Sequence, residues 1–257
     1  MHRGMIGDWA FIAGRWPLDS GLPTVVFLHG SGGTHILWEA QTEALAGVAN
    51  TVAPDLPGHG ASGGEGMTRV EDYAAAVRRF LDSLDAPRPV PCGLSLGGAI
   101  ALELLLEDAG VRCPAGILVN TGARLRVAPL IFEAIDKDYP GFVASMYKVG
   151  ASEKTDPSRI RPLAETMASC PARVTRGDFQ ACHDFDVMAR LEEIRVPVLV
   201  LTASEDRLTP PKYGAFLAGA IPGASLVNIE EAGHLSPMEK PEQVTRALRE
   251  FLQERVG

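Results

Sequence analysis

The 257-residue sequence has no long apolar run and no basic block, and each absence excludes a class of protein. No stretch of about 18 apolar residues occurs, so no segment is predicted to span a membrane. The net charge is −8 and lysine and arginine are not clustered, which argues against a nucleic-acid partner because phosphates are bound by clustered positive charge. Residues 1–4 lack the apolar core of a signal peptide, so secretion by a standard signal is not expected.

Cysteine is scarce, with four in the chain, and the spacing of these residues matches no metal-binding pattern. We therefore predict reduced thiols in a cytoplasmic protein, with no metal site. Hydrophobic residues make up 46% of the chain, which is enough for a full core and argues against an intrinsically disordered protein. The cysteines are Cys92, Cys113, Cys170 and Cys182.

Short apolar runs alternate with helical patterns over most of the chain, which predicts a largely parallel sheet covered by helices. The run at 25–28 is apolar throughout, as expected for a strand buried on both faces. The turn pair Gly7-Asp8 before Trp9 predicts an antiparallel hairpin at the start of the chain. Further strands are expected near 48–55, 90–94, 116–120, 198–202 and 225–229.

Residues 123–194 interrupt this alternation. They contain amphipathic helical stretches at 129–139, 141–149 and 161–169 and no strand-like run. This pattern predicts a helical insertion between two strands of one domain. The expected core then consists of residues 1–122 and 195–257.

The pattern G-x-S-x-G occurs at 93–97, between an expected strand and an expected helix. In that context it forms a sharp turn that holds Ser95 above the sheet. The following helix starts beside the serine hydroxyl, and its dipole favours a developing negative charge there. A plain glycine-rich turn is the alternative interpretation, because the bare pattern also arises by chance.

A nucleophilic serine needs a base, and the base needs an acid that orients it. Of the six histidines, His234 directly follows the last expected strand, at the end where catalytic groups of α/β sheets gather. The acid is expected after the strand at 198–202, where Glu205 and Asp206 are adjacent. We favour Asp206, although spacing alone does not separate the two.

Another glycine-rich turn, at 29–33, follows the strand at 25–28. Its backbone N–H groups are expected to face a cavity, where such donors stabilise an oxyanion if they are prepositioned. A phosphate-binding loop and a simple turn are the alternatives. The turn does not fit a Walker loop, since no Gly-Lys-Ser/Thr follows it.

Five motifs in register resemble the α/β-hydrolase superfamily over essentially the whole chain, in the form of a carboxylesterase-like serine hydrolase with a helical cap. They are His29-Gly30-Ser31, the segment Asp55 to Ser62, the segment Gly93 to Gly98, the segment Asp206 to Pro210, and Gly233-His234 followed by Glu239-Lys240-Pro241.

The resemblance implies an eight-stranded, mostly parallel sheet with a helical cap inserted after the sixth strand. It implies Ser95 as nucleophile, His234 as base and Asp206 as the acid that orients it. The oxyanion hole would be formed by the backbone N–H groups of Ser31 and Leu96. The order serine, aspartate, histidine along the chain is that of this superfamily.

The expected activity is hydrolysis of a small or medium carboxylic ester through an acyl-enzyme, with water as second substrate and without a cofactor. Thioesterase, lactonase, perhydrolase and carbon–carbon bond hydrolase remain alternatives on the same triad, as does a non-enzymatic ligand receptor. Carbon–carbon hydrolysis ranks lower because Leu94 and the segment 31–34 differ from the usual pattern of those enzymes. Ser95 disfavours the branches that use an aspartate nucleophile. Homo-oligomerisation stays open.

The substrate pocket is expected to be apolar, since ligand sites are mostly hydrophobic with few polar anchors. Alternatively, the candidate side chains pack the insertion onto the core, and the tryptophan lies in the core itself. The candidates are Trp38, Phe132, Phe142, Met146 and Tyr147, with Met167 beside them.

Overall fold

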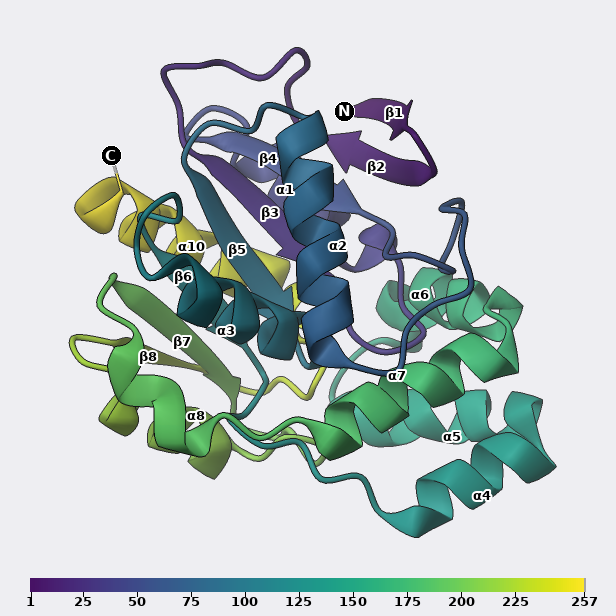
Figure 1. Cartoon of the computed structure of the whole chain (residues 1–257). Helices are drawn as coiled ribbons and strands as arrows, with labels where there is room; N and C mark the ends of the chain where they lie inside the picture. Colours follow the sequence, from purple (N-terminus) through teal and green to yellow (C-terminus); the bar gives the residue numbers. More distant parts are fainter. Residues whose placement is uncertain (257) are drawn as a thin grey trace.

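A computed structural model describes residues 1–256. Eight strands form one sheet in the order β1-β2-β4-β3-β5-β6-β7-β8 (Figure 1). β1 pairs antiparallel with β2, and β2 pairs antiparallel with β4; all other neighbours are parallel. The predicted mostly parallel sheet and its opening hairpin are confirmed. The strands are β1 His2–Ile6, β2 Trp9–Ala13, β3 Thr24–Leu28, β4 Asn50–Pro54, β5 Pro89–Leu94, β6 Gly116–Val119, β7 Val198–Ala203 and β8 Ser225–Ile229.

β3 explains why the sheet needs helices on both faces. Its side chains alternate, so that Val26 and Leu28 enter one apolar core while Val25 and Phe27 enter the other. All five residues of β3 are buried, as a strand covered on both sides requires. Helices α2 (Val70–Ser83) and α3 (Leu96–Asp108) contribute to the first core, and α10 (Pro241–Arg255) to the second.

Helices α2, α3 and α8 cover one face of the sheet, and α10 covers the other (Figure 1). α1 packs against α10. The elements not yet given are α1 Glu39–Ala44, α8 Pro211–Ala220, α9 Ser236–Glu239 and the 3₁₀ helices η1 His35–Trp38 and η2 Met188–Glu193. Within residues 1–256, no helix has both the length and the apolar character needed to cross a bilayer. The four cysteines are buried free thiols.

Four helices, α4 to α7, stand between β6 and β7 in the chain and gather at one side of the sheet (Figure 1). We call them the inserted helices. They have a small apolar cluster of their own, formed by Ile135, Phe142, Val143 and Met167. Their bounds are α4 Pro129–Lys137, α5 Tyr139–Gly150, α6 Pro157–Ser169 and α7 Ala172–Asp184.

Candidate active site

Ser95 occupies the turn between β5 and α3, with φ 56° and ψ −116°. A positive φ is unusual for a residue with a side chain and signals backbone strain held by its surroundings. A Cβ atom on Gly93 would collide with the Gly97 carbonyl, and one on Gly97 would collide with the Leu28 carbonyl. Both glycines are therefore needed for the strand to pass so sharply into the helix. The turn presents Ser95 to a cavity.

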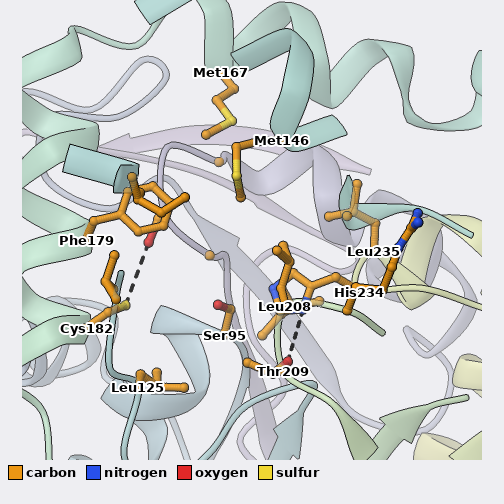
Figure 2. Close-up of a pocket in the computed structure, with 18 of the residues that line it drawn as sticks. Ser95, Leu125, Met146, Met167, Phe179, Cys182, Leu208, Thr209, His234 and Leu235 are labelled. Carbon is orange, nitrogen blue, oxygen red and sulfur yellow. Dashed lines mark hydrogen bonds between the residues drawn. The ribbon is translucent and has the colours of Figure 1, made fainter. Parts of the chain in front are cut away.

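The cavity has a volume of about 270 Å³ and lies between the sheet and the inserted helices. Ser95 and His234 both line it (Figure 2). Within residues 1–256, no hydrogen bond joins the Ser95 hydroxyl to His234 in this conformation. In enzymes without bound substrate, the distance between a nucleophile and its base is often too long for a hydrogen bond, and it shortens when substrate binds.

His234 and Asp206 form a buried pair. The Nδ1 of His234 lies 2.9 Å from the Oδ2 of Asp206, so that an Nδ1–H donates to the carboxylate and leaves Nε2 free. Asp206 also accepts hydrogen bonds from the backbone N–H groups of Leu208 and Thr209, at 2.8 and 2.9 Å. Burial alone would raise the pKa of Asp206, but His234 and the backbone N–H and hydroxyl of Thr209 hold the pKa below its ordinary value. Asp206 is therefore a stable carboxylate anion.

Glu205, the alternative acid, points elsewhere. It is partly exposed, accepts a hydrogen bond from the Ser152 hydroxyl at 2.5 Å and pairs with the Lys154 ammonium at 3.2 Å. The Ser152 hydrogen bond and Lys154 lower its pKa. The structure thus brings Asp206, and not its neighbour, to the imidazole of His234.

Two residues to which the sequence analysis gave no role hold the loop that carries His234. The Nδ2 of Asn120, which follows β6, donates to the His234 carbonyl at 2.9 Å. The buried carboxylate of Glu239 accepts from the N–H groups of Gly233, at 3.0 Å, and Ser152, at 2.8 Å. Glu239 belongs to the motif that follows His234, but a sequence motif does not show which backbone groups a side chain will contact.

The glycine-rich turn after β3 is closed by the Gly33 N–H, which donates to the Gly30 carbonyl at 3.0 Å. Beneath it, buried His29 donates from Nδ1 to the Gly30 carbonyl at 2.8 Å and accepts at Nε2 from the Leu56 N–H at 3.0 Å. Ser31 lines the cavity. Leu96, the other expected N–H donor, is the first residue of α3.

His29 makes the stability of the protein depend on pH. Burial, reinforced by the neighbouring His59, lowers the pKa of His29 from 6.5 to about 4. The unfolded chain therefore takes up a proton at a higher pH than the folded protein, and stability from this group is lost as pH falls from 6.5 towards 4. The pKa of His59 is shifted the opposite way: burial lowers it, but Asp178 raises it above its ordinary value. Its contribution is present below pH 6.5 and is lost as pH rises through its folded pKa.

We expect the free energy of unfolding to fall by about 2 kcal/mol between pH 6.5 and pH 5 because of His29. Urea unfolding of the wild type and of His29→Asn at both pH values measures this. The groups that titrate elsewhere are common to both proteins, so the variant should show a smaller decrease. An equal decrease in both proteins contradicts the assignment.

The cavity wall only partly matches the expected pocket residues. Met146 and Tyr147 line it, together with Met167, but Trp38, Phe132 and Phe142 do not. Further apolar residues of the wall include Leu125, Phe179, Leu208 and Leu235, which Figure 2 labels. Leu37, Leu94, Val127, Ile131 and Leu163 also line the cavity.

Each of the three misplaced aromatic residues has a packing role instead. Trp38 is fully buried in the core, stacks on Phe27 and donates its indole N–H to the Leu28 carbonyl. Phe142 lies in the small core of the inserted helices. Phe132 packs edge-on against a histidine ring of α7.

In the part of the chain that the structure describes, no group of three or more histidine, cysteine, aspartate or glutamate side chains is arranged to hold a metal ion.

Two arginines, Arg126 and Arg207, are among the residues that line the cavity. Both guanidinium groups already donate to backbone carbonyls, Arg126 to His183 and Arg207 to Lys148 and Ala151.

The sheet order, the strained serine turn between a central strand and a helix, and the inserted helices over the cavity define a class of α/β hydrolytic enzymes. The sequence model of the alpha/beta hydrolase family matches residues 25–247, and the chain belongs to this family. The resemblance stated from the motifs is confirmed.

Individual relatives agree with this class. The chain is 27% identical over 237 residues to a 3-oxoadipate enol-lactonase of Acinetobacter baylyi, covering 90% of this chain and 88% of the relative. It is 25% identical over 252 residues to a pimeloyl-[acyl-carrier protein] methyl ester esterase of Neisseria meningitidis, covering 93% and 96%. The solved structure of a thermophilic esterase from Thermogutta terrifontis superposes with a TM-score of 0.85 at 29% identity, covering 97% of this chain and 94% of that chain.

Proposed function

We propose that the protein hydrolyses a small or medium carboxylic ester through an acyl-enzyme formed on Ser95. One observation carries the proposal: a serine on a strained turn and a histidine bonded to a buried aspartate line the same cavity. This is the set of groups that acyl transfer to water requires. Relatives that act on methyl esters and enol-lactones support the substrate class.

In the proposed mechanism, the Nε2 of His234 removes the proton from the Ser95 hydroxyl as the oxygen attacks the ester carbonyl. The tetrahedral intermediate collapses when the imidazolium protonates the leaving alcohol. A water molecule then attacks the acyl-enzyme by the same route and releases the acid. Asp206 stays ionised throughout and stabilises the imidazolium.

The oxyanion would be held by the backbone N–H groups of Ser31 and Leu96. Leu96 begins α3, where the amides are free of intrahelical partners and the helix dipole is positive. Ser31 lies in a turn that is closed by a hydrogen bond between its ends. The Ser31 N–H would therefore need to move little during the reaction.

The cavity supports a substrate with an apolar acyl or alcohol part, because most of its wall is aliphatic, aromatic or thioether. A lactone is the second candidate, since it is an internal ester and an enol-lactonase is among the relatives. We further propose that residues 123–194 act as a cap over a core formed by 1–122 and 195–257.

Enlarging Met146 is expected to shorten the acyl chains that the cavity accepts. In Met146→Trp, kcat/KM for p-nitrophenyl octanoate should fall by about 10-fold or more, whereas the value for the acetate should change little. Val149→Trp is the matched control, because Val149 lies on the same helix but is exposed. Equal losses for both esters, or in both variants, contradict the placement of Met146 in the acyl site.

An enzyme and a receptor of the same fold are separated by pre-steady-state kinetics. With p-nitrophenyl acetate, an enzyme that accumulates an acyl intermediate releases a burst of nitrophenol equal to the number of active sites. A fluorophosphonate should label Ser95 covalently, which mass spectrometry of the tryptic peptide detects. Absence of both turnover and labelling supports the receptor instead.

A further inference from the structure

Asp178 on α7 is a fully buried carboxylate that the proposed mechanism does not use. Its Oδ2 accepts hydrogen bonds from the Gly32 N–H and from the Nε2 of His59, both at 2.8 Å. Its Oδ1 accepts from the Tyr73 hydroxyl at 2.6 Å. The three donors come from three separate parts of the chain: the glycine turn after β3, the loop after β4, and α2. The carboxylate of Asp178 therefore connects one of the inserted helices to three segments of the core.

The charge of Asp178 is stabilised at this point. A buried carboxylate is costly unless charged and polar partners surround it. The raised pKa of His59, which burial opposes and Asp178 causes, favours an imidazolium–carboxylate pair. Burial and Asp178 together raise the pKa of Tyr73, so its hydroxyl remains a donor. All three contacts are thus hydrogen bonds to a carboxylate anion, the strong kind.

The contact with Gly32 selects one form of the glycine turn. Gly32 has a φ of 65°, and Ser31 is not among the residues with positive φ. With the hydrogen bond between Gly30 and Gly33, this is a type II turn. A type I turn differs by a flip of the central peptide, which carries the Ser31 carbonyl and the Gly32 N–H. The flip would aim that carbonyl at the Asp178 carboxylate, where two oxygens repel.

We infer that Asp178 is a positioning residue for the oxyanion hole: by binding the Gly32 N–H it holds the turn in the form that presents the Ser31 N–H to the cavity. The inference rests on the proposed function. Ser31 contributes both the donor N–H and the carbonyl of the central peptide, so a flip changes the backbone immediately next to the donor. Because Asp178 belongs to α7, the inserted helices help to form the hole as well as to line the cavity.

Asparagine at position 178 keeps the size of the side chain but removes the selection. Its amide can accept from the Gly32 N–H or donate to the Ser31 carbonyl, so both turn forms become acceptable. An oxyanion donor acts through preorganisation, and its misplacement lowers the chemical rate more than it weakens substrate binding. The affected constant should therefore be kcat.

Tyr73→Phe is the matched control, because it removes another donor to Asp178 but leaves the contact with Gly32. With p-nitrophenyl acetate, we expect kcat of Asp178→Asn to fall by about 10- to 100-fold with KM within about threefold of wild type. Tyr73→Phe should keep kcat and KM within about threefold, even where its melting temperature falls. An unchanged kcat in Asp178→Asn, or an equal loss in both variants, overturns the inference.

The amide of Gly32 in the wild-type protein provides a second readout that does not depend on a variant folding. In ¹⁵N–¹H spectra its proton should resonate downfield and exchange slowly, because it is buried against a carboxylate. Rapid exchange of that proton would overturn the inference. The Ser95→Ala variant distinguishes failure of the proposed function from failure of the role of Asp178. If kcat of the wild type is no higher than that of Ser95→Ala, the proposed function is wrong. If kcat of the wild type is higher than that of Ser95→Ala but equal to that of Asp178→Asn, only the role of Asp178 is wrong.

Discussion

Replacing Ser95 with alanine is expected to lower kcat for p-nitrophenyl acetate by about 10⁴- to 10⁶-fold and to abolish labelling by a fluorophosphonate. The variant lacks the oxygen proposed to form the acyl-enzyme, while the other residues that line the cavity remain in place. Any residual rate should come from binding and oxyanion stabilisation without covalent catalysis. Steady-state kinetics and intact-protein mass spectrometry measure the two effects.

Ser145→Ala is a suitable control for this experiment. The Ser145 hydroxyl donates to the Phe142 carbonyl within α5 and does not line the cavity. Its loss should leave turnover and labelling as in the wild type. Comparable turnover in Ser95→Ala and wild type would refute nucleophilic catalysis by Ser95.

The second large effect is expected at Asp206. Asp206→Asn should lower kcat by about 10³- to 10⁴-fold, because an asparagine amide facing His234 favours the imidazole tautomer with the proton on Nε2. In that tautomer, Nε2 carries a proton and has no lone pair with which to accept the Ser95 proton. Melting temperatures of both proteins show whether the loss reflects catalysis or unfolding.

Glu205→Gln makes the same change of charge at the neighbouring residue. The side chain of Glu205 contacts Ser152 and Lys154 and not the imidazole, so kcat should stay within about threefold of the wild type. If Glu205→Gln lost as much activity as Asp206→Asn, the buried pair would not be the orienting contact.

The sequence alone predicted the parts of the fold that depend on local chemistry. The continuous apolar run of β3 indicated burial on both faces, and alternate residues of that strand do enter two different cores. The glycines at 93 and 97 indicated a tight turn, because no other residue can accommodate the contacts that they make. Motif order along the chain identified the family, which the match over residues 25–247 confirms.

The lining of the cavity could not be predicted in this way. Apolar residues at helical spacing face the interior, but spacing does not distinguish a cavity wall from a packed core. Met146 lines the cavity, whereas Phe142, four residues earlier on the same helix, packs against the other inserted helices. Trp38 likewise satisfies its indole N–H on a buried carbonyl, which no pattern in the sequence indicates.

The sequence by itself determined the order of strands and helices along the chain, because apolar periodicity is a local property. Its G-x-S-x-G pattern and the order of its motifs indicated the sharp turn at Ser95 and the residue types able to carry acyl transfer. Only the tertiary structure decided that Asp206 and not Glu205 meets His234, and that Asp178 binds an amide 146 positions away. Contacts at such separation arise when packing of whole elements fixes where each side chain points. A one-dimensional pattern does not contain that information.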